Sequence, residues 1–175
     1  VKKNIFDVCG MENSAFLIDD LNRLVCQYRY NEETDKVEKC TGDNVYRIGT
    51  EYESGGAGCV STLEDYIKFL EAIRTYKLLK KETVDLLSTN QLTREQLDMP
   101  SYWVYGKPGF GLGQRCPADE SQLPEFGWGG AAGAYYFIDV KNGITAYFAT
   151  HVLGYERFQQ ARGIIADIAE KILVD

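Results

Sequence analysis

A glycine-rich segment that leads into an aromatic and β-branched stretch is the part of this chain best suited to receive another molecule. The segment covers residues 127–133, and the stretch covers residues 134–139. Glycines at the start of a strand let a ligand approach closely, because no side chain shields the backbone N–H and C=O groups. The pattern predicts a place where a ligand lies against a strand backbone.

Other residues could do chemistry, but each has a simpler structural interpretation. Ser61 is a candidate nucleophile, yet Glu64 stands three residues later, which is the spacing of a helix-capping box. His151 could pair with a cysteine, but a lone histidine at the end of a strand is usually a surface residue. The five cysteines are widely spaced and include no CxxC pair, so we expect reduced thiols, no disulfide framework and no zinc site.

Composition bounds the class of protein. The chain has 175 residues, which is the size of one domain with its own core, and 45% of them are hydrophobic. A net charge of −7 argues against nucleic acid and anionic membranes as partners. No apolar run reaches the length of a membrane span. We therefore expect a single globular domain.

Local patterns predict the elements of the first two thirds of the chain. A charged stretch over residues 32–38 indicates a turn between two short extended segments. Apolar residues at helical spacing predict a helix over 62–76, with Ser61 as its N-cap. A second helix is expected over 81–88, and a capping box at 93–96 predicts a single helical turn. The inward-facing residues of the second helix are expected to be Val84, Leu86 and Leu87.

The last third is expected to form a sheet and a terminal helix. Strands are predicted over 109–113 and on either side of Asn142-Gly143, which favours a hairpin with a type I′ turn. A C-terminal helix is predicted to pack one apolar face on the core, through Phe158, Ala161, Ile165, Ile168 and Ile172. The coarse picture is α+β, with an irregular region over 1–60, helices over 61–99, and the sheet with its terminal helix over 105–175.

Four blocks of residues recur in the order and spacing of one known superfamily. They are Ile5-Phe6 with Gly10-Met11, Ser54-Gly55-Gly56-Ala57-Gly58 with Ser61-Thr62 and Asp65-Tyr66, Gly109-Phe110-Gly111-Leu112-Gly113, and Trp128-Gly129-Gly130. They resemble the serine β-lactamase and penicillin-binding-protein superfamily, in the branch of class C β-lactamases, D-Ala-D-Ala carboxypeptidases and related esterases. The chain departs from the family at Val8-Cys9, where the family has Pro-Leu. The resemblance implies a β-lactamase/transpeptidase-like fold, of which this chain is the C-terminal portion, with antiparallel strands covered by a C-terminal helix.

The resemblance also implies a site. Trp128-Gly129-Gly130 is similar to the family's third motif, Lys/His-X-Gly or Trp-X-Gly, and Ala131 would then supply a backbone donor to the oxyanion hole. Ser54 and Gly55 join the motif as substrate-binding candidates. Trp128 replaces a cation that would meet the carboxylate of a β-lactam, which favours an esterase-like or peptidase-like activity on a small ester, amide or peptide, with no metal or organic cofactor. Trp128 could instead be a core aromatic, and the 54–58 loop only a lead-in to the helix.

The family's nucleophile is absent from the sequence. It lies in Ser-X-X-Lys, and no serine of this chain has lysine three residues later. In the family that motif precedes the point that matches Ile5. We therefore expect the C-terminal part of a serine hydrolase that works through an acyl-serine, inactive alone and partnered by the N-terminal half of the domain. The alternatives are a non-catalytic module of the same fold that binds peptides or other acyl ligands, and an interaction protein built from half a domain.

A sheet that lacks its N-terminal strands has an open edge. Such an edge invites pairing with another copy of the chain, because its backbone groups have no partners. We therefore expect a homo-oligomer that forms through a sheet edge or an exposed apolar face.

Overall fold

A computed structural model describes residues 1–41, 53–56, 58–99, 108–155, 163–165, 168–169 and 171–172. The helices are α1 (Asp7–Cys9, preceded by a π-helical turn at Lys2–Phe6), α2 (Leu63–Arg74), α3 (Lys81–Ser88) and α4 (Arg94–Leu97), with a 3-10 turn at Leu21–Arg23. The strands are β1 (Tyr28–Asn31), β2 (Lys36–Lys39), β3 (Gly109–Phe110), β4 (Arg115–Cys116), β5 (Phe126–Gly129), β6 (Tyr135–Asp139), β7 (Ile144–Phe148) and β8 (Val152–Leu153).

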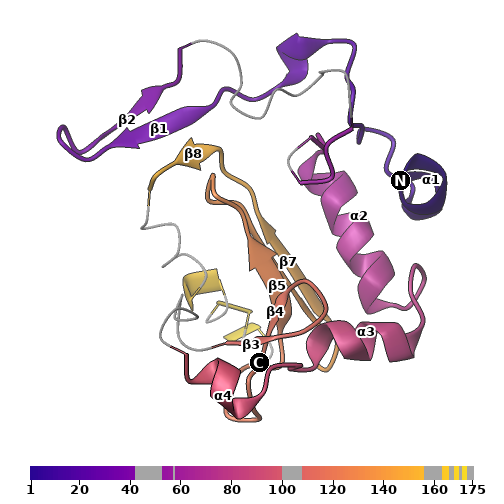
Figure 1. The fold of residues 1–175 in the computed structure, drawn as a ribbon. Coiled ribbons are helices and arrows are strands. Elements are labelled where there is room, and N and C mark those ends of the chain that lie inside the picture. Colours follow the sequence, from indigo (N-terminus) through magenta and orange to yellow (C-terminus); the bar gives the residue numbers. More distant parts are fainter. Residues whose placement is uncertain are drawn as a thin grey trace.

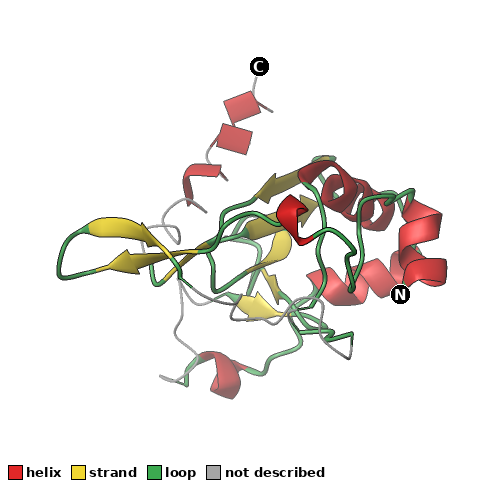
Figure 2. Cartoon of the chain, turned by 90° about the horizontal axis from the view of Figure 1, so that it is seen from above, coloured by secondary structure: helices red, strands yellow, loops and turns green. Residues whose placement is uncertain are grey.

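The strands form two sheets beside the helices (Figure 1). The larger sheet has the order β3-β4-β5-β6-β7 and is antiparallel throughout. The smaller has the order β2-β1-β8, with β8 parallel to β1. Figure 2 shows the β1–β2 hairpin projecting at the opposite end of the molecule from the N-terminal helix. The predicted α+β class is confirmed, and so is the turn between two extended segments that the charges at 32–38 indicate.

Of the helices that the structure describes, none has both the length and the apolar character that crossing a membrane requires.

The helix α2 begins at Leu63, one residue later than a cap at Ser61 would predict. Thr62, the last extended residue before the helix, is the N-cap, and its hydroxyl accepts a hydrogen bond from the Asp65 N–H at 3.2 Å. The hydroxyl of Ser61 instead lies 2.8 Å from that of Ser14. The prediction of Ser61 as the cap is therefore wrong, because this side chain is engaged with the N-terminal segment.

The two shorter helices follow the sequence closely. α3 has the predicted bounds, and α4 begins with the predicted capping box between Thr93 and Gln96. Val84 is buried as expected, but Leu86 is exposed. Leu86 stands two residues after Val84, which is about 200° around the helix, so the two cannot face the same core.

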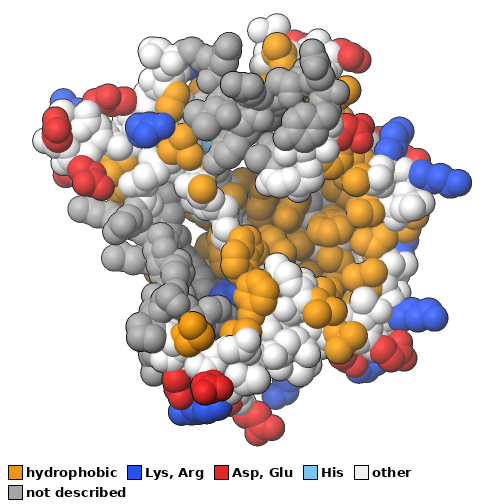
Figure 3. Space-filling model, in the orientation of Figure 1, with side chains coloured by type: hydrophobic (Ala, Val, Ile, Leu, Met, Phe, Trp, Pro, Cys, Tyr) orange, Lys and Arg blue, Asp and Glu red, His pale blue; other side chains and the backbone are white. Residues whose placement is uncertain are grey.

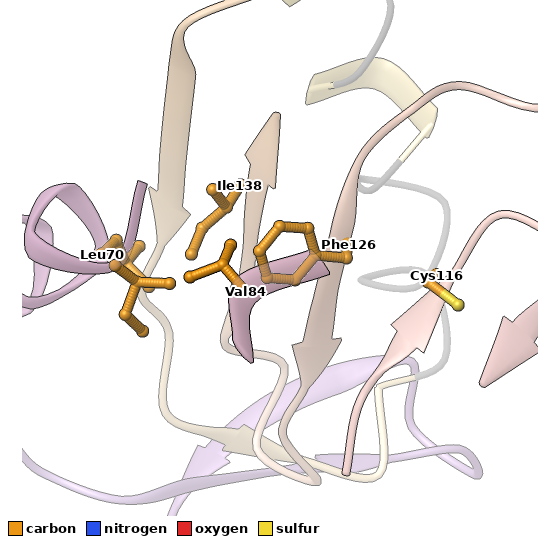
Figure 4. Close-up of a cluster of buried hydrophobic side chains, with 6 residues drawn as sticks. Leu70, Val84, Cys116, Phe126 and Ile138 are labelled. Atoms are coloured by element: carbon orange, nitrogen blue, oxygen red, sulfur yellow. The ribbon is translucent and has the colours of Figure 1, made fainter. Parts of the chain in front are cut away.

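The main core is a seam between the helices and one face of the larger sheet. Leu70 of α2, Val84 of α3, Phe126 of β5 and Ile138 of β6 converge there, each with 1% or less of its surface exposed (Figure 4). Burial of a side chain of this size stabilises a fold by about 1.5–3 kcal/mol relative to leaving it in water. The seam therefore fixes β5 and β6 firmly against α2 and α3.

The N-terminal residues are helical rather than irregular, and they pack on α2. Phe6, Cys9 and Met11 form a second buried cluster with Ala72. Residues 1–11 are therefore attached to α2 by apolar contacts.

A buried carboxylate also holds the N-terminal segment. Asp65, 1% exposed, accepts hydrogen bonds from the Asn13 N–H at 2.7 Å, the Ser14 hydroxyl at 2.9 Å and the Lys68 ammonium at 3.2 Å. Burial alone would raise the pKa of Asp65, but these three hydrogen bonds outweigh it and hold the pKa below its ordinary value. The ionised carboxylate therefore stabilises the folded chain.

The β6–β7 hairpin is confirmed, but its turn is not type I′. Asp139 pairs with Ile144, which leaves a four-residue connection. The Asp139 carboxylate accepts hydrogen bonds from the Asn142 N–H at 2.9 Å and from its side-chain amide at 2.7 Å. A type I′ turn needs a positive φ at both central residues, and here Gly143 has one (φ 76°) whereas Asn142 does not.

The described residues of the C-terminal helix do not pack as predicted. Residues 163–165, 168–169 and 171–172 are helical (Figure 2), yet Ile168 and Ile172 are 51% and 72% exposed. With Ile164 they form an i, i+4, i+8 stripe that faces water, whereas Ile165 is partly buried. The prediction that Ile168 and Ile172 pack on the core is therefore wrong, and Phe158 and Ala161 lie outside the described residues.

Replacement of Asp65 by alanine should destabilise the chain by about 3 kcal/mol at neutral pH, since it strands buried donors of Asn13 and Ser14. Because the folded-state pKa of Asp65 is below the unfolded one, this contribution is present above about pH 4 and is lost as the pH falls further. Urea denaturation as a function of pH measures it. Glu64→Ala, on the adjacent exposed position, serves as the control and should change stability by less than about 0.5 kcal/mol. Equal losses in the two variants would contradict the assignment.

Candidate functional site

The candidate site begins where β5 leaves its pairing with β4. β4 meets β5 at one residue pair, Arg115 with Gly127, whereas β6 pairs with all four residues of β5. The Gly130 N–H donates to the Ala134 carbonyl at 2.7 Å, and backbone hydrogen bonds alternate between the two sides of an antiparallel strand. The N–H and C=O of Gly129 therefore face away from β6, toward an edge to which no strand of the described residues pairs beyond Gly127.

A tight turn that contains Ala131 follows this edge. The Gly133 N–H donates to the Gly130 carbonyl at 3.0 Å and closes the turn over residues 130–133. The Ala132 carbonyl accepts a hydrogen bond from the Val152 N–H at 3.0 Å, which ties the turn to β8. Ala131, an exposed residue, is the second residue of this turn. The edge at Gly129 thus leads directly into an exposed turn that contains Ala131.

Gly127 is required by the close approach of β5 to β6. A Cβ at this position would lie 2.0 Å from the Tyr136 carbonyl oxygen and 2.8 Å from the Cα of Phe137. At Gly129 the nearest atoms would be 3.7 and 3.8 Å away, which is ordinary contact. Gly127 is therefore needed for the pairing of β5 with β6, whereas a side chain could be accommodated at Gly129.

Trp128 is a partly exposed side chain and not a core aromatic. It is 49% exposed, and its ring meets that of Phe110 edge to face, with centroids 5.7 Å apart. The pair forms an apolar surface next to Gly129. The indole carries no charge, so this surface favours an uncharged part of a ligand.

A buried polar network, which the sequence analysis missed, lies across β5. The Arg115 guanidinium donates to both carboxylate oxygens of Glu125, at 2.8 and 3.2 Å. It also donates to the Tyr135 hydroxyl, which in turn donates to Glu125 at 3.1 Å. All three residues are buried. In sequence they are ten positions apart, with nothing in the spacing to signal that they meet.

Half-buried tyrosines line the other face of the sheet, against α2. The Tyr66 ring stacks on that of Tyr147, with centroids 4.4 Å apart, and meets Tyr136 edge to face at 5.7 Å. Burial, together with these two neighbours, raises the pKa of Tyr66 far above its ordinary value, so its hydroxyl stays neutral. Figure 3 shows apolar side chains gathered in a hollow between α2 and the sheet. The molecule therefore has an apolar recess on this face.

The structure does not join Ser54 and Gly55 to the candidate site. The Ser54 carbonyl accepts from the Gly58 N–H at 2.9 Å, which closes the loop on itself; among the described residues no hydrogen bond links either residue to 128–131. Ala57 lies outside the described residues.

His151 is placed beside the smaller sheet. Its Nε2 lies 2.9 Å from the Gln27 amide nitrogen, and burial lowers the pKa of the imidazole. An amide nitrogen donates only, so the neutral ring accepts at Nε2. All five cysteines are free thiols, and within the described part of the chain there is no cluster of three or more histidine, cysteine, aspartate or glutamate residues that could hold a metal ion.

One family model matches nearly the whole chain. A family model described as Beta-lactamase matches residues 1–170. No curated protein matches the sequence.

Solved structures resemble the chain over most of its length. Simvastatin synthase (LovD) from Aspergillus terreus has a TM-score of 0.72 at 24% identity, over 86% of this chain and 44% of that one. EstCE1, a hydrolase with promiscuous acyltransferase activity, gives 0.69 at 21%, over 90% and 47%. A penicillin-binding protein from Bacillus halodurans gives 0.60 at 18%, over 94% and 48%. The chain spans less than half the length of each, and the predicted fold is confirmed.

Replacement of Gly127 by alanine should destabilise the chain by more than about 3 kcal/mol, since the new methyl group would overlap the β6 backbone. Gly129→Ala is the matched control in the same strand and should change stability by less than about 1 kcal/mol, because its Cβ has room. Thermal and urea unfolding of the two variants measure the difference. Comparable stabilities would show that β5 and β6 are not held this closely.

Proposed function

Because this chain belongs to the beta-lactamase family, we propose that it supplies the backbone half of a serine acyl-transfer site, for an ester, amide or peptide substrate. The observation that carries the proposal is the strand edge at Gly129, which has no partner strand among the described residues and leads into the turn over residues 130–133. In that turn the N–H of the exposed Ala131 would act as the donor. We also propose that the chain belongs to the branch of class C β-lactamases, carboxypeptidases and esterases within this family. We propose further that it forms the C-terminal part of the domain.

The chemistry assigns a definite task to this edge. When a serine hydroxyl attacks a carbonyl carbon, negative charge develops on the carbonyl oxygen, and fixed N–H donors stabilise it. Ala131 N–H is one such donor. Gly129 lies two residues before it, at the strand edge, where its C=O and N–H can bond a substrate backbone. Trp128 and Phe110 flank the edge with apolar surface.

We propose that the nucleophile comes from outside these 175 residues. The sequence holds no Ser-X-X-Lys, so we propose that the chain alone does not form an acyl-serine. We further propose that the segment bearing the nucleophile occupies the apolar recess between α2 and the sheet (Figure 3). Its supporting features are the apolar surface of the recess and the half-buried tyrosines that line it.

The uncharged Trp128 favours neutral acyl groups over anionic ones. A lysine or histidine in its place would attract a substrate carboxylate, and an indole does not. We therefore propose an esterase-like or peptidase-like activity for the complete site. One of the similar structures, EstCE1, is a hydrolase with promiscuous acyltransferase activity, which supports this choice.

A second candidate function is a non-catalytic module that binds acyl ligands. The exposed Trp128 and the partly buried Phe110 favour it, since the pair offers binding surface without a nucleophile.

Association of copies is a related proposal. β7 ends the strand order of the larger sheet, and Ile164, Ile168 and Ile172 expose apolar surface. Both features suit self-association, and light scattering at increasing concentration tests it; a monomer throughout would contradict it.

Incubation of this chain with a fluorophosphonate, and separately with a penicillin, should leave its intact mass unchanged. The reason is that both reagents react with an activated serine far faster than with other side chains. Intact-mass spectrometry is the measurement. A stoichiometric adduct would contradict the proposal that the nucleophile is absent, and peptide mapping would locate the serine.

Ala131→Pro should weaken the binding of an oxyanion mimic by about tenfold or more, which is the loss of one hydrogen bond to a charged group. Proline suits the second position of a tight turn, so the backbone is kept while the N–H is removed. The probe is p-nitrophenyl methylphosphonate, and its binding is measured by the quenching of Trp128 fluorescence. The other tryptophan, Trp103, is replaced by phenylalanine in every variant so that only Trp128 contributes to the signal. Ala131→Gly, which keeps the N–H, is the control. Equal affinities would refute the role of this donor.

A further inference from the structure

The buried network of Arg115, Glu125 and Tyr135 has no part in the chemistry just proposed, yet it lies directly under the candidate site. Arg115 belongs to β4, Glu125 immediately precedes β5, and Tyr135 begins β6. Its hydrogen bonds form a closed ring, in which Tyr135 accepts from Arg115 and donates to Glu125. The Arg115 guanidinium also lies over the Tyr135 ring, 5.5 Å from its centroid. The network therefore links three neighbouring strands of the larger sheet, β4, β5 and β6.

The network crosses β5 at its glycines. Arg115 is the cross-strand partner of Gly127, and Tyr135 is the partner of Gly129. Cross-strand partners share a face of the sheet, so both side chains stand on the face to which positions 127 and 129 belong. Strands β4 and β6 are two strand spacings apart, roughly 9–10 Å. The side chains bridge this distance over the β5 backbone, because neither glycine places a side chain in the path.

Stability alone is a weak reason for such a network. Replacement of a buried ion pair by apolar side chains of similar size is often neutral or stabilising. The neighbouring Phe137, on the same face of β6, is an apolar residue with 2% of its surface exposed. What the ion pair adds is a fixed geometry, because a guanidinium and a carboxylate that share two hydrogen bonds hold one relative orientation.

We propose that Tyr135, held by Arg115 and Glu125, is a positioning residue for the backbone donors of the candidate site. Tyr135 stands opposite Gly129 and one residue after Ala134, whose carbonyl accepts the hydrogen bond of Gly130. Clamping Tyr135 to β4 fixes the spacing of β4, β5 and β6 where the 130–133 turn begins. The direction of the Ala131 N–H depends on that turn. The role of the donors rests on the proposed function, but their positioning does not.

Tyr135→Phe tests the inference with a single oxygen removed. The Arg115–Glu125 ion pair and the contact of Arg115 with the aromatic ring remain, but the hydrogen bonds that join the pair to β6 are lost. Amide hydrogen exchange, followed by NMR, should become at least tenfold faster at Gly130 and Gly133, whose N–H groups close the turn. Exchange at Leu70 and Ile138, in the core seam, should change by less than twofold. A merely structural role would raise exchange at all four positions together, and that result would overturn the proposal.

Tyr136→Phe is the matched control. It removes the neighbouring tyrosine hydroxyl of the same strand, which donates to Gln114 at 2.9 Å on the opposite face. Exchange at Gly130 and Gly133 should stay within twofold of the wild-type chain. A response equal to that of Tyr135→Phe would show that any tyrosine hydroxyl on β6 has this effect, and it would overturn the assignment to the network.

An apolar replacement separates positioning from stability. Arg115→Met, Glu125→Leu and Tyr135→Phe together should leave the melting temperature unchanged or higher, yet speed exchange at Gly130 and Gly133 by at least tenfold. Affinity for p-nitrophenyl methylphosphonate should fall in parallel. Unchanged exchange in a folded triple variant would refute the inference. If the wild-type chain does not bind the phosphonate, the proposed function fails, while the exchange rates still decide the positioning role.

Discussion

The close approach of β5 to β6 at Gly127 is the constraint on which the rest of the structure depends. Only hydrogen fits between the two backbones at that position, so the register of the pair is fixed. In that register Phe126 enters the seam with α2 and α3, and Gly129 faces the unpaired edge. A slip of one residue would exchange the two faces and expose the core. The core and the candidate site are thus consequences of the same pairing.

Features set by neighbours in the sequence were predictable. The bounds of α3, the capping box of α4 and the β6–β7 hairpin depend on residues within a few positions of one another, and the sequence predicts them correctly. The cap of α2 was not, because Ser61 and Thr62 both suit the position and Ser14, far away in the chain, engages Ser61. The hairpin turn differs for another reason, since the Asp139 carboxylate binds Asn142 nearby, and this local contact is not part of the Asn-Gly pattern that predicted the turn.

Around the candidate site, too, residues that are contiguous in the sequence were predictable and residues that are far apart were not. Trp128, Gly129, Gly130 and Ala131 are contiguous, so a resemblance in sequence could point to them together. Arg115, Glu125 and Tyr135 are scattered, and charged residues are usually exposed. Their partnership exists only once β4, β5 and β6 are paired, so no periodicity in the sequence reveals it. The exposed stripe at Ile164, Ile168 and Ile172 escaped prediction for the opposite reason, since its helical spacing is the same whether the face meets a core or water.

An oxyanion site made of backbone groups can be rigid before its nucleophile is present. A side-chain donor has rotamers to fix, whereas the direction of the Ala131 N–H follows from the turn and the strands that hold it. Donors that are already oriented need not reorganise when charge develops, which is why such sites lower a barrier effectively. The buried network and the Val152 hydrogen bond to the turn both lie within this chain. The orientation of the proposed donors would therefore be a property of residues 1–175, and the proposed partner segment would contribute the hydroxyl, its base and its placement in the recess.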